Sequence, residues 1–185
     1  LFAECENLSE IRVVGEEGNI RMVDGVLFNG DMTRLIRCSR EKSGSYEIPP
    51  TVKIIDECAF QSCNLLTSIV IPDSVTEIPN SAFDTCSGLG AVTIPKSVTS
   101  IGISAFNSCT SLESVVIPDS VTSIGNGAFS YCSSLTSVTI PKSVTSVGDF
   151  VFGFCDNLMA VTIPSGLNYP GNAFIGSLIV TITKY

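Results

Sequence analysis

The hydrophobic and polar positions of this chain recur with a fixed period of 23 residues over most of its length. Phenylalanine, cysteine and proline mark the period, and each keeps its phase over five copies. The phenylalanines are Phe60, Phe83, Phe106, Phe129 and Phe152, and the prolines are Pro72, Pro95, Pro118, Pro141 and Pro164. A constant period of about 20 to 30 residues is typical of a solenoid, in which each repeat stacks on its neighbours. We therefore predict one coil per repeat.

Each repeat contains the apolar pattern Leu-x-x-Val-x-Ile, which predicts its local structure. Alternation at Val138 and Ile140 is typical of a short strand with one face buried. The proline that follows ends this strand because it has no N–H to donate. A second, shorter extended piece has the pattern Val-x-x-Ile. In the Ala-Phe-x-x-Cys segment, Ala128 and Cys132 are four residues apart, which predicts one or two turns of α- or 3₁₀-helix.

The expected fold class is therefore an α/β solenoid, a right-handed coil of 23-residue units with short parallel strands and short helical turns. Residues 14–45 break the period. Within them, residues 26–28 and 33–37 flank Asn29-Gly30-Asp31, which predicts an inserted β-hairpin because Asn-Gly accepts positive φ.

The end of the chain is an imperfect repeat. Ile182 follows Ile163 by 19 residues, and Ser177 stands where the period places a cysteine. This segment suits a terminal cap or a degenerate internal repeat. We predict a partial repeat at 1–13, the hairpin insertion at 14–45, 23-residue repeats at 46–167, and a shortened terminal repeat or cap at 168–185.

Phrases such as "AFNSCTSLESVVIPDSVTSI" and "AFSYCSSLTSVTIPKSVTSV" resemble the leucine-rich repeats of the BspA-like family. The resemblance covers about residues 46–167. It departs from the general leucine-rich repeat, because residues 72–75 stand where that pattern has an asparagine and a further leucine. The resemblance implies an extracellular or cell-surface protein that binds host or matrix proteins, or other surface proteins.

Composition limits the function classes. The chain is 44% hydrophobic and 15% charged, with a net charge of -8 and no histidine. An acidic balance opposes nucleic-acid binding, which requires basic side chains to neutralise phosphates. No apolar run approaches the roughly 18 to 20 residues that span a bilayer. We therefore expect a packed protein with no nucleic-acid partner and no transmembrane segment in this chain.

The cysteine column is the first candidate for chemistry. Its members are Cys63, Cys86, Cys109, Cys132 and Cys155. Thiolate metal sites usually need close pairs or histidine, and stacked side chains do not readily reach the χ₃ near ±90° of a disulfide. We favour structural thiols that fill space and donate to loop carbonyls, and keep disulfides as an alternative. Cys38 and Cys58 lie off the column and could pair with each other.

Catalysis has no evident basis in the sequence. The many serines have no histidine as a base and no G-x-S-x-G phrase, and acids such as Asp84, Glu113 and Asp149 occupy different phases of the repeat. No glycine-rich loop suits a phosphate. We expect no enzyme activity, no catalytic residue, no metal and no cofactor.

The outward strand positions are the candidate ligand-binding face. They are Val70, Thr93, Val116, Thr139 and Thr162. Stacked coils would align these small side chains into a flat, lightly charged surface, although β propensity alone also explains them. Ordering of water or carbohydrate by the threonines is a more remote alternative, because Val70 and Val116 interrupt the column.

A column of alternating charge follows the prolines and comprises Asp73, Lys96, Asp119 and Lys142. Opposite charges on adjacent coils favour correct register, so we interpret this column as a structural ladder. The residues themselves indicate a stackable scaffold, and the family resemblance implies a non-enzymatic protein-binding or adhesion module of a bacterial surface or secreted protein. The alternative is a structural spacer solenoid with no ligand of its own.

Overall fold

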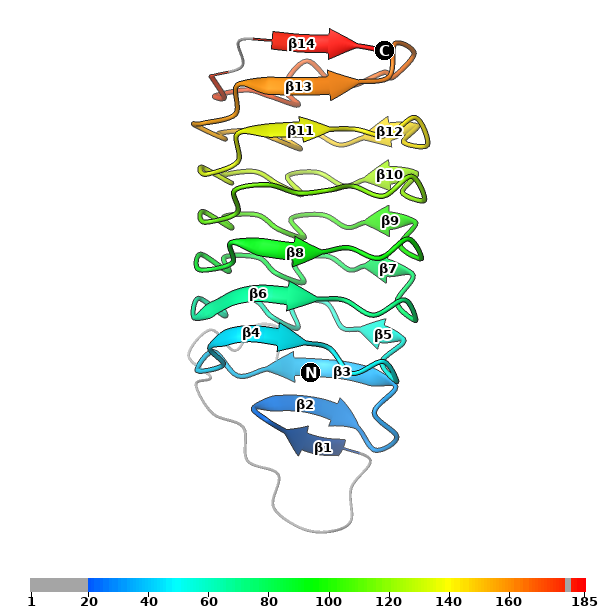
Figure 1. Ribbon diagram of the computed structural model, residues 1–185, viewed down its shortest axis with the longest axis vertical. Coiled ribbons are helices and arrows are strands. Elements are labelled where there is room, and N and C mark those ends of the chain that lie inside the picture. Colours follow the sequence, from blue (N-terminus) through cyan, green and yellow to red (C-terminus); the bar gives the residue numbers. More distant parts are fainter. Residues whose placement is uncertain (1–19, 179–180) are drawn as a thin grey trace.

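The structure is a computed structural model that describes residues 20–178 and 181–185. The predicted partial repeat at 1–13 lies outside the described residues. The described residues form successive coils stacked along one axis (Figure 1). Their strands are β1 (Ile20–Val23), β2 (Val26–Asn29), β3 (Arg34–Cys38), β4 (Gly44–Glu47), β5 (Ile54–Ile55), β6 (Leu66–Val70), β7 (Glu77–Ile78), β8 (Ala91–Thr93), β9 (Ser100–Ile101), β10 (Ser123–Ile124), β11 (Ser137–Thr139), β12 (Ser146–Val147), β13 (Ala160–Ile163) and β14 (Thr181–Lys184).

One side of the solenoid, which we call the strand face, carries the longer parallel strands of the repeats. It comprises the sheets β4-β6-β8 and β11-β13-β14. The two sheets do not join, because residues 113–117 between them form no strand. The strand expected in this coil is therefore absent, although its sequence follows the same pattern as its neighbours. Val115 and Ile117 remain buried, so packing keeps the coil in place without a regular ladder.

The second side carries the two-residue strands. They form the sheet β12-β10-β9-β7, and all their pairings are parallel. These strands correspond to the shorter extended pieces expected from the Val-x-x-Ile pattern. A glycine in close contact with the preceding coil follows three of these strands. At Gly148, for example, an added Cβ would lie 2.4 Å from the backbone nitrogen of Asn126. A side chain at this position would therefore push neighbouring coils apart.

The third side, which we call the turn face, consists of the Ala-Phe-x-x-Cys segments. We predicted helical turns here, and the prediction is wrong, because the described residues contain no helix. In the five 23-residue repeats, the residue before the segment and the residue before its cysteine have positive φ, as Ser104 (53°) and Ser108 (57°) do. A left-handed residue cannot continue a right-handed helix. The segment is instead a series of tight turns, and its N–H groups also donate to the next coil, as from Phe83 to the carbonyl of Ala105 at 2.8 Å.

The core lies between the three sides. The repeat phenylalanines are fully buried and stack on one another, with centroid separations of 5.0 to 5.3 Å. Burying such a ring contributes about 1.5–3 kcal/mol, so the phenylalanine column is a major apolar component of the core. Repeated leucines, valines and isoleucines pack around it.

The N-terminal end of the described solenoid is closed by antiparallel strands. β1, β2 and β3 pair in order, and β3 continues in parallel to β5. The two segments expected as hairpin arms are β2 and β3. Val26, Leu27 and Phe28 of β2 are fully buried, so this meander covers the end of the core.

The last coil differs from the expected alignment. Ile182 of β14 pairs with Val161 of β13, and Lys184 pairs with Ile163. The coil is therefore shorter than the 23-residue repeat by two residues, and aligning Ile182 with Ile163 was wrong. The sequence of residues 180–182 is Val-x-Ile, as in the repeat strands, and this made the other alignment plausible; the pairing with β13 fixes the register.

Candidate functional site

The strand face carries the outward column predicted as a binding surface. Within each sheet, residues of this column are direct partners on neighbouring strands: Val70 pairs with Thr93, and Thr139 pairs with Thr162. Thr93 and Thr139 are exposed, and Thr162 is half-buried. Val116 stands in the interval between the sheets with 79% of its surface exposed. The column is continued by Glu47 at one end and by Thr183 at the other.

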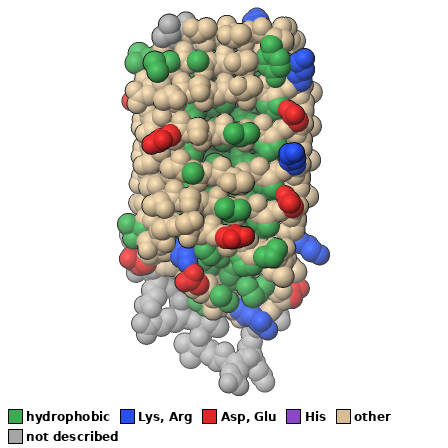
Figure 2. Space-filling view, viewed as in Figure 1, with side chains coloured by type: hydrophobic (Ala, Val, Ile, Leu, Met, Phe, Trp, Pro, Cys, Tyr) green, Lys and Arg blue, Asp and Glu red, His purple; other side chains and the backbone are tan. Residues whose placement is uncertain are grey.

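The middle of the strand face is largely uncharged (Figure 2). A shallow recess lies beside the interval between the two sheets and is lined by Glu113, Ser114, Ser134, Thr136 and Asn157. The recess offers hydroxyl groups, an amide and one carboxylate. These groups can form hydrogen bonds with a ligand.

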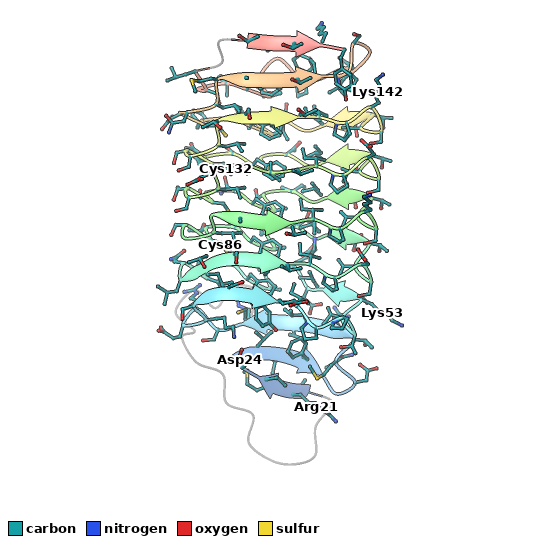
Figure 3. The ribbon with its side chains drawn as sticks, viewed as in Figure 1. Arg21, Asp24, Lys53, Cys86, Cys132 and Lys142 are labelled. Carbon is teal, nitrogen blue, oxygen red and sulfur yellow. The ribbon has the colours of Figure 1, made fainter. Side chains whose placement is uncertain are left out.

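The cysteine column is buried inside the solenoid, and Figure 3 labels two of its members, Cys86 and Cys132. Cys132 is fully buried, and its Sγ donates to the carbonyl of Phe106 at 3.2 Å. Cys86, Cys109 and Cys155 do the same to the phenylalanine one coil earlier, at 2.9, 3.2 and 3.1 Å. The seven cysteines in the described part of the chain are free thiols.

Burial favours the protonated form of four thiols of the column. Burial raises the pKa of Cys86, Cys109 and Cys132 well above the ordinary value and raises the pKa of Cys155 to about 12. A thiolate, not a thiol, is the nucleophile and the metal ligand. The described residues also contain no group of three acidic, cysteine or histidine side chains placed to hold a metal.

The two cysteines off the column occupy different environments. The thiols of Cys38 and Cys63 both donate to the carbonyl of Ser39, at 3.5 and 3.6 Å. The hydrogen bond with Cys63, and then burial, raise the pKa of Cys38. Cys58 is half-buried with φ of 58° on the turn face. Cys38 is therefore a neighbour of Cys63, and the suggested pairing of Cys38 with Cys58 is not what the structure has.

The column of alternating charge lies exposed along one edge of the strand face, where positive and negative side chains alternate (Figure 2). Among the described residues, which include all four members, no ion pair within 4 Å joins them. The ammonium of Lys142 instead lies 5.2 Å from the ring centroid of Tyr185. The role of this column in register stays a prediction.

Two aromatic residues on the turn face, the exposed Tyr131 and the half-buried Phe154, were not predicted from the sequence as functional residues. Tyr131 and Phe154 stand in the column that Ser62, Thr85 and Ser108 occupy in earlier coils. The signal was present as a departure from the repeat: bulky aromatic residues replace small polar ones at one phase.

Comparisons with known proteins give one consistent result. The model of the BspA type leucine-rich repeat region matches residues 38–121 and 76–183, with six copies. The solved structure of a leucine rich cell surface protein from Faecalibacterium prausnitzii is similar, with a TM-score of 0.75 and 32% identity over 91% of this chain. No match was found among the curated proteins.

Two further solved structures share this fold. A leucine-rich repeat protein from T. pallidum has a TM-score of 0.68 and 27% identity, over 86% of this chain and 81% of that protein. One from Bacteroides ovatus has a TM-score of 0.68 and 28% identity over 89% of this chain. The present chain spans about half (51%) of the proteins from F. prausnitzii and B. ovatus.

Proposed function

The chain belongs to the BspA type leucine-rich repeat family, and we propose that it is a non-enzymatic protein-binding or adhesion module of a bacterial surface or secreted protein. The similar F. prausnitzii structure is described as a cell surface protein, which supports this location. The described residues contain no helix that could cross a membrane. Host proteins, matrix proteins and other surface proteins are the proposed partners.

The observation that carries this proposal is the outward column of the strand face. Seven aligned positions run from Glu47 to Thr183. With strands about 4.8 Å apart, the column is roughly 29 Å long. A typical protein interface buries about 800 Å² on each partner, and a flat surface of this length can supply such an area. Its small hydroxyl and methyl groups can contact a partner without the cost of desolvating charges.

Binding to immobilised matrix glycoproteins tests the proposal. We expect the unmodified chain to bind at least one of them. The test variant carries Thr93→Lys, Thr139→Lys and Thr162→Lys, which place three ammonium groups on the strand face. Three buried charges at an interface weaken binding strongly because each loses its water.

The matched control carries Thr99→Lys, Thr122→Lys and Thr145→Lys. These exposed threonines stand beside the strands of the second side, so the control has the same change in net charge. Loss of binding in the test variant alone supports the strand face. Equal binding by both variants removes the strand face as the site, and no binding by the unmodified chain favours the spacer.

A further inference from the structure

Three aromatic residues cluster at the surface of the turn face and form what we call the aromatic patch; Tyr131 and Phe150 are exposed, and Phe154 is half-buried. Tyr131 and Phe150 are 49% and 40% exposed. The rings of Tyr131 and Phe154 stack at 4.8 Å with an interplanar angle of 12°, and Phe150 lies 6.5 Å from Phe154. The backbone N–H of Phe154 donates to the carbonyl of Ile175, whose side chain is also exposed.

All three aromatic residues have left-handed backbone conformations, with φ of 59° at Tyr131, 55° at Phe150 and 57° at Phe154. Bulky side chains rarely adopt this conformation. Small residues fill the same columns in the other coils, where they are Ser62, Thr85, Ser108 and Gly176 in one and Cys58, Ser81, Ser104 and Gly127 in the other. The coil therefore requires positive φ but not an aromatic side chain.

The aromatic patch does not contribute to the core. Phe152, which lies between Phe150 and Phe154 in the sequence, is fully buried in the phenylalanine column. Phe150 is exposed and Phe154 is half-buried, and neither belongs to the core. Strained, exposed aromatic residues that folding does not require indicate a function.

Contacts on both sides restrict the ring of Phe154. One face of the Phe154 ring stacks on Tyr131. Gly176 packs against the same ring, because a Cβ on Gly176 would lie 2.5 Å from its Cδ1 atom. Rigid aromatic side chains lose little conformational entropy on binding and are common at the energetic centres of protein interfaces.

Charge defines the partner. Asp149 directly precedes Phe150, Asp156 follows Phe154 by two residues, and both carboxylates are exposed. No lysine or arginine occurs between Lys142 and Lys184. A second copy of this chain would bring the same carboxylates together and add another net charge of -8. Complementarity instead favours a cationic partner.

We propose that the aromatic patch is a second interaction surface, which binds a basic peptide segment carrying an apolar or aromatic side chain. The apolar side chain contacts the rings of Tyr131, Phe150 and Phe154, and the lysine or arginine side chains lie near Asp149 and Asp156. This surface is separate from the strand face, and its occupant is a peptide rather than a glycan or a second copy.

A peptide of lysine, leucine and one tryptophan is the probe. The chain contains no tryptophan, so the fluorescence anisotropy of the probe reports binding without background. The test variant is Tyr131→Ser with Phe154→Thr, which installs residue types already present at Ser108 and Thr85. The control variant exchanges those two residues, Thr85→Ser with Ser108→Thr. Circular dichroism checks that each variant is folded.

We expect the unmodified chain and the control to bind the probe, and the test variant to bind at least about tenfold more weakly. Asp149→Asn with Asp156→Asn weakens binding most at low salt. A glutamate analogue of the probe does not bind. These results support the proposal.

Equal affinity of the test variant and the unmodified chain overturns the proposal, because attraction would then be charge alone. Absence of probe binding also overturns the proposal. Two results would then identify a different occupant of the patch: binding of a neutral oligosaccharide, or a dimer in sedimentation velocity that the test variant abolishes. The probe and these variants do not involve the strand face, so this test and the matrix-protein test can fail independently.

Discussion

Ser177 and Phe152 make, in the last coil, the contact that a cysteine and a phenylalanine make in the coils before it. The hydroxyl of Ser177 donates to the carbonyl of Phe152 at 2.7 Å, as the thiol of Cys155 donates to the carbonyl of Phe129 at 3.1 Å. The shared feature of the column is therefore a small side-chain donor. This equivalence explains why the period can lose its cysteine without losing the bond between coils.

A cysteine-to-serine change in the middle of the column tests this interpretation. We expect Cys132→Ser to keep the bond to the carbonyl of Phe106 and to change the free energy of unfolding by less than about 1 kcal/mol. Cys132→Ala loses both the donor and buried volume, and costs about 1–2 kcal/mol. Urea denaturation monitored by circular dichroism measures both values. A serine variant less stable than the alanine variant would contradict the donor role.

Alkaline pH should unfold the protein through the same column. Burial raises the folded-state pKa of Cys86, Cys109 and Cys132 well above the ordinary value and that of Cys155 to about 12. The unfolded thiols ionise near pH 8.5. The stabilisation is therefore complete below about pH 8.5 and is lost as pH rises toward the folded-state pKa.

Denaturation at pH 7, 8.5 and 10 measures this dependence. We expect a falling free energy of unfolding above pH 8.5 and a shallower fall in Cys132→Ser, which has one thiol fewer. A pH dependence that is identical in the two proteins would show that other groups are responsible.

The left-handed positions of the turn face predict a stabilising glycine. Ser104 has φ of 53°, and Gly127 occupies the same column in the next coil. We expect Ser104→Gly to stabilise the protein by about 0.5–1 kcal/mol, because glycine adopts positive φ without a Cβ clash. Ser137→Gly in strand β11 is the control and should destabilise by about 0.5–1 kcal/mol. Thermal unfolding of the two variants should give shifts of opposite sign, and shifts of the same sign would refute the backbone explanation.

The column of alternating charge predicts a salt-dependent register effect. Lys96→Asp places a negative charge between Asp73 and Asp119, and we expect a loss of about 0.2–1 kcal/mol at low salt. Salt screens interactions between exposed charges, so the loss should shrink in 0.5 M NaCl. Lys184→Asp, at the end of β14, controls for the change in net charge. An equal effect of both variants would mean that the column does not set register.

Much of the fold follows from the phase of the repeat. Residues that share a phase lie in one column, and this places Phe106 on Phe83 and Thr139 beside Thr162 without further information. The turn face could not be predicted in this way. Ala128 and Cys132 are spaced as in a helix. The residue with left-handed φ between them is Tyr131, and only a glycine there would have indicated positive φ from the sequence.

Neither agreement with the period nor departure from it determines the structure alone. The sequence of residues 113–117 matches the repeat, yet no strand forms there, so the period alone does not determine local pairing. The aromatic residues Tyr131 and Phe154 break the period at one phase, and the structure shows that they are exposed or half-buried on the surface. In this chain, the residues that keep the period predicted the core, and the aromatic residues that break it lie at the surface.

The claim that the strand face binds protein is tested most directly by the ratio of two dissociation constants. The first belongs to the variant with lysine at 93, 139 and 162, and the second to the variant with lysine at 99, 122 and 145, both against the glycoprotein that the unmodified chain binds. We expect a ratio of at least about 100, since three desolvated charges cost several kcal/mol. A ratio near one would contradict the claim.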